Sequence, residues 1–180
     1  AELLSNTIME NRDALAYISF ESQGNLKGIG NLKPLLYAIR NNRIILFVHE
    51  NFETGGHTDY LIKPYLLKEY QGRWYVCGLL ENDEQRTFGI DRIEQLIVSS
   101  ETYKRNDKID FKAKFEEIVG LTYSETELQE VILSFTPRQG KYVKALPMHH
   151  SQRIITDNET EFIIKMRIRP NFEFKQKILM

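Results

Sequence analysis

The chain has 180 residues, of which 42% are hydrophobic and 27% are charged, a composition typical of a folded soluble protein and not of a disordered, collagen-like or disulfide-rich chain. Its 24 Lys and Arg residues almost balance 25 Asp and Glu residues, and the net charge of −1 excludes a basic surface over the whole molecule. Apolar runs such as residues 44–48 are far shorter than the roughly 20 residues that cross a bilayer, so we expect no membrane partner.

The N-terminal 30 residues carry weak structural signals, and we interpret 1–30 as a connecting segment. Residues 2–15 have the composition of a helix or a loose segment, and a short apolar piece follows at 15–20. Asn31 is a candidate N-cap for a helix with apolar residues at helical spacing, which the Asn41-Asn42 pair would end.

The segment after this helix has the pattern of short antiparallel strands separated by turns. One helix followed by about five such strands predicts a small, strongly curved β-barrel, and we assign it to residues 31–105. The predicted strands are residues 43–50, 60–70, 73–80, 86–88 and 93–98, with loops at 51–58 and 81–85.

The second and third of these strands are joined by only two residues, Gln71 and Gly72. A two-residue connection that ends in Gly favours a β-hairpin, because the turn needs a positive φ that Gly adopts at low cost. This connection would pair Tyr70 with Arg73 and set the register of the whole hairpin.

A polar stretch at 101–112 predicts a linker, and the pattern changes after it. A β-α-β-β order follows, which is typical of a small split α+β (ferredoxin-like) module, here assigned to residues 106–180. The chain ends in a strand-like apolar run at 178–180 and does not begin with Met, so we expect a fragment of a longer protein. The predicted elements are a helix at 111–121, a strand at 129–135, a helix at 137–146 and strands at 153–156 and 161–168.

The charges are distributed unevenly along the chain. Residues 138–180 hold nine Lys and Arg against four Asp and Glu, a net of +5, which leaves −6 for the first 137 residues. This asymmetry indicates two modules or an anionic partner near the C-terminal part. The alternative interpretation is an ordinary solvated strand face.

Motifs for catalysis or metal binding are absent from the sequence. It contains no G-x-S-x-G, H-E-x-x-H or C-x-x-C, so we predict no catalytic residue, no metal site, no cofactor and no enzyme. His149 and His150 would point to opposite faces of a strand, which suits no shared metal site. The glycines at 28–30 imitate a dinucleotide-binding turn, but Lys33 occupies the third glycine position. Cys77 is the single cysteine and predicts a reducing, cytoplasmic compartment.

The strongest functional signal is a set of aromatic and basic residues within the predicted strands. Arginine offers phosphate a planar fork of donors, and flat rings provide faces on which bases stack. We expect the arginines to converge beside the Trp74-Tyr75 pair. The alternative is that Trp74 is a core anchor and that Asp91 and Arg92 form a buried pair that locks a turn. The candidate ligand-binding residues are Tyr65, Arg73, Trp74, Tyr75, Arg86 and Arg92.

Some of these residues form an ordered set: Pro64-Tyr65, Trp74-Tyr75-Val76 and Arg86-x-Phe88-x-x-Asp91-Arg92-Ile93. With Val in place of Leu, this set resembles the WYL-domain family of bacterial transcriptional regulators over residues 31–103. Residues 128–180 look like the C-terminal extension that often follows the domain. Gly89 and His49 depart from the family pattern, in which Arg and Tyr are common at these positions.

The resemblance implies an Sm-like β-barrel that senses an effector, with a nucleotide or a short single-stranded nucleic acid as the proposed ligand. DNA is contacted in such regulators through a winged helix-turn-helix, for which some 30 N-terminal residues leave no room. Our first hypothesis is therefore the effector-sensing regulatory portion of such a regulator, as a homodimer. The second is an oligomerisation or protein-interaction module with no small ligand. The third is an enzyme acting on a phosphorylated small molecule, for which no base or nucleophile can be named.

Overall fold

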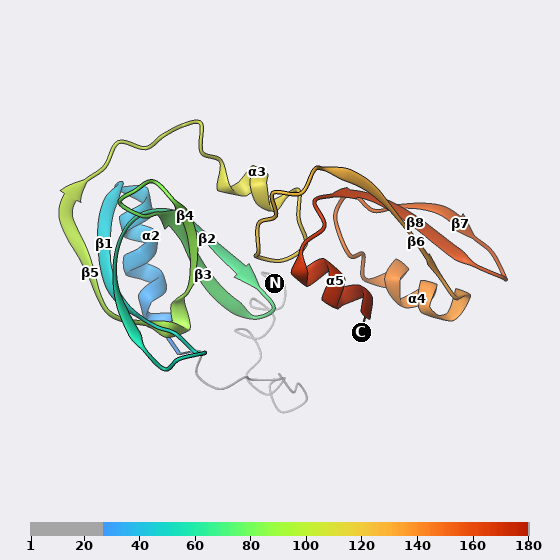
Figure 1. The fold of residues 1–180 in the computed structure, drawn as a ribbon, viewed down its shortest axis with the longest axis horizontal. Coiled ribbons are helices and arrows are strands. Elements are labelled where there is room, and N and C mark those ends of the chain that lie inside the picture. The colour runs from blue at the N-terminus through green and yellow to red at the C-terminus, as the bar shows by residue number, and fades with distance from the viewer. Residues whose placement is uncertain (1–26, 180) are drawn as a thin grey trace, which may run out of the picture.

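The structure is a computed structural model that describes residues 27–179. The segments expected at 2–15 and 15–20 lie outside the described residues. A five-stranded sheet with one long helix is followed by a three-stranded sheet with two helices (Figure 1), which confirms a mainly β fold with some α. The helices are η2 (Ile29–Asn31), α2 (Leu32–Arg40), η3 (Ile90–Arg92), α3 (Phe111–Phe115), α4 (Pro137–Ala145) and α5 (Phe172–Leu179). The strands are β1 (Arg43–Glu50), β2 (His57–Tyr70), β3 (Arg73–Leu79), β4 (Gln85–Gly89), β5 (Ile93–Thr102), β6 (Gln129–Phe135), β7 (Arg153–Asp157) and β8 (Phe162–Ile168).

The first sheet is antiparallel, with the strand order β4-β3-β2-β1-β5. The predicted β2–β3 hairpin is confirmed, since Tyr70 pairs with Arg73 and both turn residues, Gln71 and Gly72, have positive φ angles of 51° and 75°. Within residues 27–179, β4 and β5 do not pair with each other. The sheet is therefore open in its hydrogen bonding, and the closed barrel remains a prediction.

The face of this sheet that α2 covers holds the main hydrophobic core. Leu35 and Ala38 of α2 are fully buried against Ile45 of β1 and Ile62 of β2. The helix begins and ends where the sequence indicates, but Asn31 forms no side-chain cap. Because η2 runs directly into α2, Asn31 already has helical backbone angles, whereas an N-cap residue adopts extended ones.

The opposite face of the sheet is covered by the segment predicted as a linker. β5 continues to Thr102, and Tyr103 and Phe111 are then buried against Tyr65 and Cys77 in a second apolar cluster. The hydroxyl of Tyr103 donates a hydrogen bond to the carbonyl of Pro64. These apolar residues are too widely spaced to produce a periodic pattern, which is why the sequence indicated a plain linker.

The helix expected at 111–121 is only five residues long, so that prediction was wrong. α3 begins at an N-cap, Asp110, whose carboxylate accepts a hydrogen bond from the amide of Ala113 at 3.0 Å. Beyond it the chain turns, with a positive φ of 85° at Gly120. Ile118 and Val119 are both buried although they are neighbours in sequence. A surface helix buries only one face, so consecutive buried residues disfavour a helix here.

The second sheet has the strand order β6-β8-β7 and is also antiparallel. The predicted alternation in β8 is confirmed, since alternate residues are buried toward α4 and α5, which lie on the same side of the sheet (Figure 1). The prediction that the chain ends in a strand was wrong, because α5 continues through Leu179. Asn171 accepts a hydrogen bond from the amide of Phe174 at 3.0 Å and so favours a helix start. None of the helices within residues 27–179 has the length and apolar character needed to cross a membrane.

Candidate functional site

The alternation of side chains along β3 separates the two aromatic residues at the centre of the predicted site. Neighbouring residues of a strand point to opposite faces of the sheet. Trp74 packs against the core on the α2 side, next to the buried Val76 and Phe88. Tyr75 lies on the other face, where it lines a pocket. The six predicted residues therefore do not form one cluster.

Four aromatic rings, carried by β1, β2 and β4, meet on the α2 side of the sheet. The ring centroid of Phe88 lies 4.6 Å from Tyr60, 5.2 Å from His49 and 5.1 Å from Phe47. The register of β1 against β2, in which Phe47 pairs with Tyr60, brings these rings together. Offset and edge-on contacts of this kind stabilise the ring positions.

Two of the predicted arginines lie around these rings, each over an aromatic side chain. The guanidinium carbon of Arg86 is 5.8 Å from the Tyr60 ring centroid, and Nη1 donates to the Tyr60 hydroxyl at 3.3 Å. The same guanidinium also pairs with Glu84 at 3.1 Å. The guanidinium carbon of Arg92 lies 4.9 Å from the ring centroid of Phe52 in the β1–β2 loop.

His49 lies between the two arginine–ring pairs, because its ring is near that of Tyr60 and it senses the charge of Arg92. Arg92 forms no ion pair among the described residues, and its buried Nε has no hydrogen-bond partner. Burial lowers the pKa of His49, and the positive charge of Arg92 lowers it further. His49 therefore tends to be neutral beside Arg92 and adds no competing charge. We call Phe52, Tyr60, His49, Arg86 and Arg92 the arginine–aromatic face.

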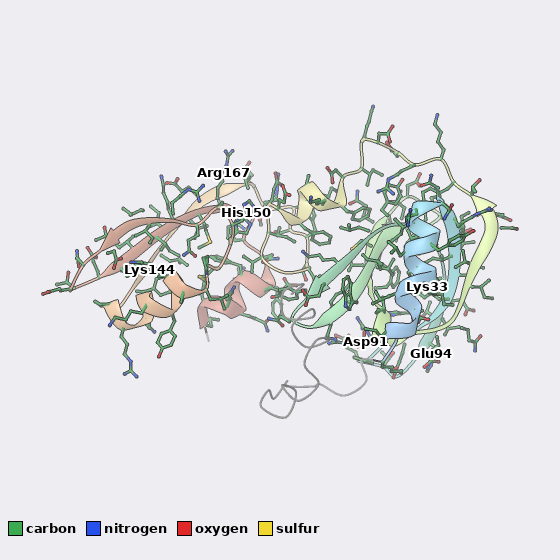
Figure 2. The ribbon with its side chains drawn as sticks, turned by 180° about the vertical axis from the view of Figure 1, so that it is seen from behind. Lys33, Asp91, Glu94, Lys144, His150 and Arg167 are labelled. Atoms are coloured by element: carbon green, nitrogen blue, oxygen red, sulfur yellow. The ribbon has the colours of Figure 1, made fainter. Side chains whose placement is uncertain are left out.

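Arg73 forms an ion pair with Asp91, the residue that precedes Arg92. Asp91 lies in η3, which directly follows β4 and packs against β3. The hydrogen bond to Asp91 raises the pKa of Arg73. The alternative of an Asp91–Arg92 ion pair does not hold, because the carboxylate of Asp91 pairs with Arg73 of β3 instead. Asp91 lies near the start of α2 (Figure 2).

Tyr65 is buried beneath the segment that follows β5. Its side chain is 3% exposed, its ring packs on those of Tyr103 and Phe111, and the guanidinium carbon of Arg105 lies 4.5 Å from its centroid. Its hydroxyl accepts a hydrogen bond from the amide of Asn106 at 3.0 Å. The ring and the hydroxyl of Tyr65 are thus both engaged within the chain.

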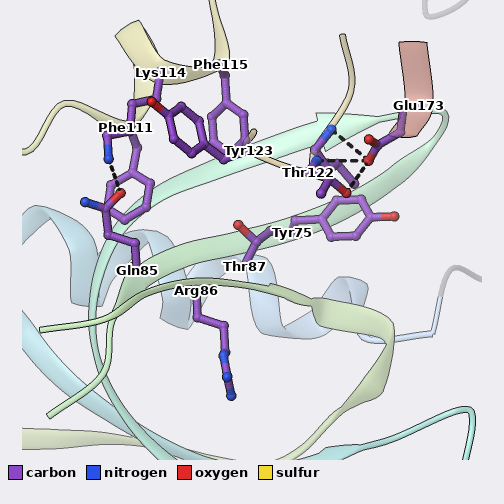
Figure 3. A pocket seen from close by; sticks show the side chains of 11 residues that line it. Tyr75, Gln85, Arg86, Thr87, Phe111, Lys114, Phe115, Thr122, Tyr123 and Glu173 are labelled. Atoms are coloured by element: carbon purple, nitrogen blue, oxygen red, sulfur yellow. Dashed lines mark hydrogen bonds between the residues drawn. The ribbon is translucent and has the colours of Figure 1, made fainter. Parts of the chain in front are cut away.

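A pocket of about 390 Å³, the junction pocket, lies where Tyr75 emerges from the sheet (Figure 3). Its lining comes from β3, β4, α3, the turn at 121–123 and α5. Arg86 also lines the pocket, but its guanidinium points away from the rings. The lining residues are Tyr75, Gln85, Arg86, Thr87, Phe111, Lys114, Phe115, Leu121, Thr122, Tyr123 and Glu173.

The cysteine and the paired histidines, which are residue types that often act in catalysis or metal binding, do not form such a site among the described residues. Burial raises the pKa of the Cys77 thiol to about 11, so the thiol stays protonated. His149 and His150 lie in a turn with ring centroids 4.2 Å apart, so the prediction of opposite strand faces was wrong. Between residues 27 and 179, no group of three or more His, Cys, Asp or Glu side chains is placed to hold a metal ion.

The sequence-based list of candidate site residues lacked several residues that belong to the arginine–aromatic face and to the junction pocket. His49 and Tyr60 had a usable signal, since both lie in predicted strands on the same face as Phe47. Lys114 and Tyr123 had none, because each is separated from Tyr75 by more than 35 residues and reaches it only through the tertiary fold.

The comparison with protein-family models agrees with the resemblance seen in the sequence. The WYL domain matches residues 30–98. Among solved structures, the chain is similar to proteasome accessory factor B/C (PafBC) of Arthrobacter aurescens, with 16% sequence identity and a TM-score of 0.47. That similarity covers 81% of this chain and only 22% of that one. No curated protein matches the sequence.

Proposed function

This chain contains a WYL domain at residues 30–98, and we propose that it is the effector-sensing regulatory portion of a bacterial transcriptional regulator. The proposed effector is a nucleotide or a short single-stranded nucleic acid, bound on the arginine–aromatic face. Residues 31–105 would form the Sm-like sensor and 106–180 its extension, in a cytoplasmic homodimer with no enzymatic activity. DNA would be contacted by a winged helix in another part of the regulator.

The proposal depends chiefly on two guanidinium groups that lie over aromatic rings around one aromatic cluster. Arg92 has no carboxylate partner within the described residues, and Arg86 has a single exposed one, Glu84. An exposed pair of this kind contributes at most about 1 kcal/mol, so a phosphate can displace it. The positive charges are therefore available to an anionic ligand.

The rings would supply the second half of the recognition. Phe52 is 59% exposed, and Tyr60 is half-buried at the edge of the core. Stacking a base on an exposed ring contributes about 1–3 kcal/mol in single-strand binders. Since Arg73, Tyr65 and Trp74 are engaged elsewhere, Arg86 and Arg92 are the predicted residues best placed to act together with such rings.

The test is the binding of a fluorescent single-stranded oligonucleotide about eight nucleotides long. Binding is measured by fluorescence anisotropy and by the shift in the melting temperature of the protein. Arg86→Ala and Arg92→Ala should each weaken binding about tenfold, the loss of one charge-assisted contact. Arg138→Ala, an exposed arginine of α4, is the matched control and should bind normally. The absence of any shift across a panel of nucleotides and oligonucleotides would contradict the proposal.

A role in oligomerisation is the second candidate function, and one surface favours it. Leu46 pairs with Ile97 across β1 and β5 and with Leu61 across β1 and β2, and Leu46 and Ile97 are 37% and 59% exposed. This apolar row would be covered by a second copy of the chain. Sedimentation velocity over a range of concentrations tests it, and a monomer at every concentration would exclude it.

A further inference from the structure

We propose that the junction pocket is a second ligand site, separate from the arginine–aromatic face, and that it binds a small aromatic monoanion such as an aromatic carboxylate. The site joins the WYL domain to the extension. It takes a different class of molecule from the proposed nucleic-acid effector, and it does not depend on that proposal.

The shape and walls of the pocket suit a flat apolar molecule. Its volume of about 390 Å³ is within the usual range for small-molecule sites, which are mostly apolar with a few placed polar groups. Four rings line it, two of them from α3, and hydroxyl groups are interspersed among them (Figure 3). The rings are those of Tyr75, Phe111, Phe115 and Tyr123.

Lys114 supplies the positive charge of the pocket. Its ammonium group donates to the neutral side-chain oxygen of Gln85 at 2.7 Å and lies 4.9 Å from the ring centroid of Tyr123. It forms no ion pair with any carboxylate in the described part of the chain. An ammonium group has three donors, so Lys114 can keep Gln85 and still bind a ligand carboxylate.

Glu173 limits the ligand to one negative charge. It lies at the other end of the pocket from Lys114 (Figure 3). One of its oxygens accepts hydrogen bonds from the amides of Leu121 and Thr122 and from the Thr122 hydroxyl, at 3.3, 2.9 and 2.8 Å. The carboxylate is thereby held in place. A second negative charge near it would be repelled, which disfavours a nucleoside polyphosphate and favours a monoanion whose charge lies at Lys114.

The position of the pocket gives binding there a consequence for the whole chain. Tyr75 and Thr87 belong to the WYL sheet, whereas Thr122 and Tyr123 belong to the turn that leads into the extension. A ligand that contacts all four stabilises the arrangement in which both sides of the pocket are present. Occupancy would therefore couple the WYL domain to the extension.

The experiment compares naphthoate with its uncharged amide, naphthamide, by calorimetric titration of the intact chain. We expect naphthoate to bind at one site and more tightly than naphthamide. Lys114→Met keeps most of the apolar stem but removes the charge, so naphthoate affinity should fall about tenfold while naphthamide affinity stays the same. Thr87→Phe, which fills the pocket from β4, should abolish the binding of both.

Lys112→Met is the matched control, because Lys112 is an exposed lysine of the same short helix that does not line the pocket. It should bind both molecules like the unmodified chain, and circular dichroism should show that all variants fold. The proposal would be overturned if naphthoate did not bind, or if acid and amide bound with equal affinity. Unchanged binding in both Lys114→Met and Thr87→Phe would overturn it as well. Oligonucleotide binding measured on Lys114→Met should be normal, which separates this site from the arginine–aromatic face.

Discussion

The two faces of the WYL sheet use similar side chains for different purposes. On the α2 side, rings continue the core outward and end at Arg86, which is exposed, and Arg92, which is half-buried. On the other side, Tyr65 and Cys77 are closed in by Tyr103 and Phe111. The same aromatic and basic composition thus produces a charged edge on one face, and on the other an apolar layer that adjoins the junction pocket. The difference lies in what covers each face, which is a helix on one side and an irregular segment on the other.

The largest effect should come from removing the ring at the centre of the α2-side cluster. Phe88→Ala leaves a cavity among Phe47, His49 and Tyr60 and should lower the free energy of unfolding by about 3–5 kcal/mol, measured by urea denaturation. Phe52→Ala removes a ring that is 59% exposed and should cost no more than about 0.5 kcal/mol. Equal losses in the two variants would show that the cluster is not part of the core.

A smaller effect is expected on the sealed face. Tyr103→Phe removes the hydroxyl that donates to the Pro64 carbonyl and should lower the free energy of unfolding by about 1 kcal/mol, because a buried acceptor loses its partner. Burial also raises the pKa of Tyr103 to about 12. Tyr142→Phe, at a site that is 72% exposed, should leave stability unchanged. No loss in Tyr103→Phe would mean that the hydrogen bond from Tyr103 to the Pro64 carbonyl does not stabilise this face.

The smallest effect concerns the loss of stability at acidic pH and depends on the protonation of His49 on the α2 side. The pKa of His49 is lower in the folded chain than its ordinary value of 6.5, mainly through burial, so the unfolded chain binds more protons as the pH falls through 6.5. Stability should be complete above that pH and decline below it. His49→Phe should reduce the decline between pH 7 and 5, measured by urea denaturation at each pH.

Part of the acid decline should remain in His49→Phe, because burial also lowers the pKa of His149 in the extension. The double variant with His149→Phe should flatten the profile further. An unchanged pH profile in His49→Phe would show that Arg92 and the surrounding rings do not disfavour the charged imidazole.

The local elements with strong patterns could be predicted from the sequence. The strand at 43–50, the hairpin at Gln71-Gly72 and the strand at 129–135 occur as expected, because period-2 burial and a two-residue turn are local signals. Ile178 and Leu179 were misassigned to a strand, because the Asn171 cap and the burial of Phe174 act from outside that apolar run. Apolar composition by itself does not distinguish a short helix from a strand.

The candidate site could be predicted only in part, and for a specific reason. Arg86 and Arg92 do lie beside aromatic rings, but the rings are Tyr60 and Phe52, not those of the Trp74-Tyr75 pair. Strand alternation already implies that Trp74 and Tyr75 face apart. The pairing of Asp91 with Arg73 does not follow from strand register, because Asp91 lies in η3, beyond the end of β4.

The sequence by itself determined the WYL domain, its order of strands along the chain and the types of side chain available for recognition, because periodicity, turn residues and motif spacing are local properties. Only the tertiary structure decided that Arg86 and Arg92 lie beside Tyr60 and Phe52, and that Lys114 and Tyr123 join Tyr75 around one pocket. Such contacts depend on how separate segments pack over the sheet. That packing is set by the burial of apolar surface from distant parts of the chain, which no short stretch of sequence contains.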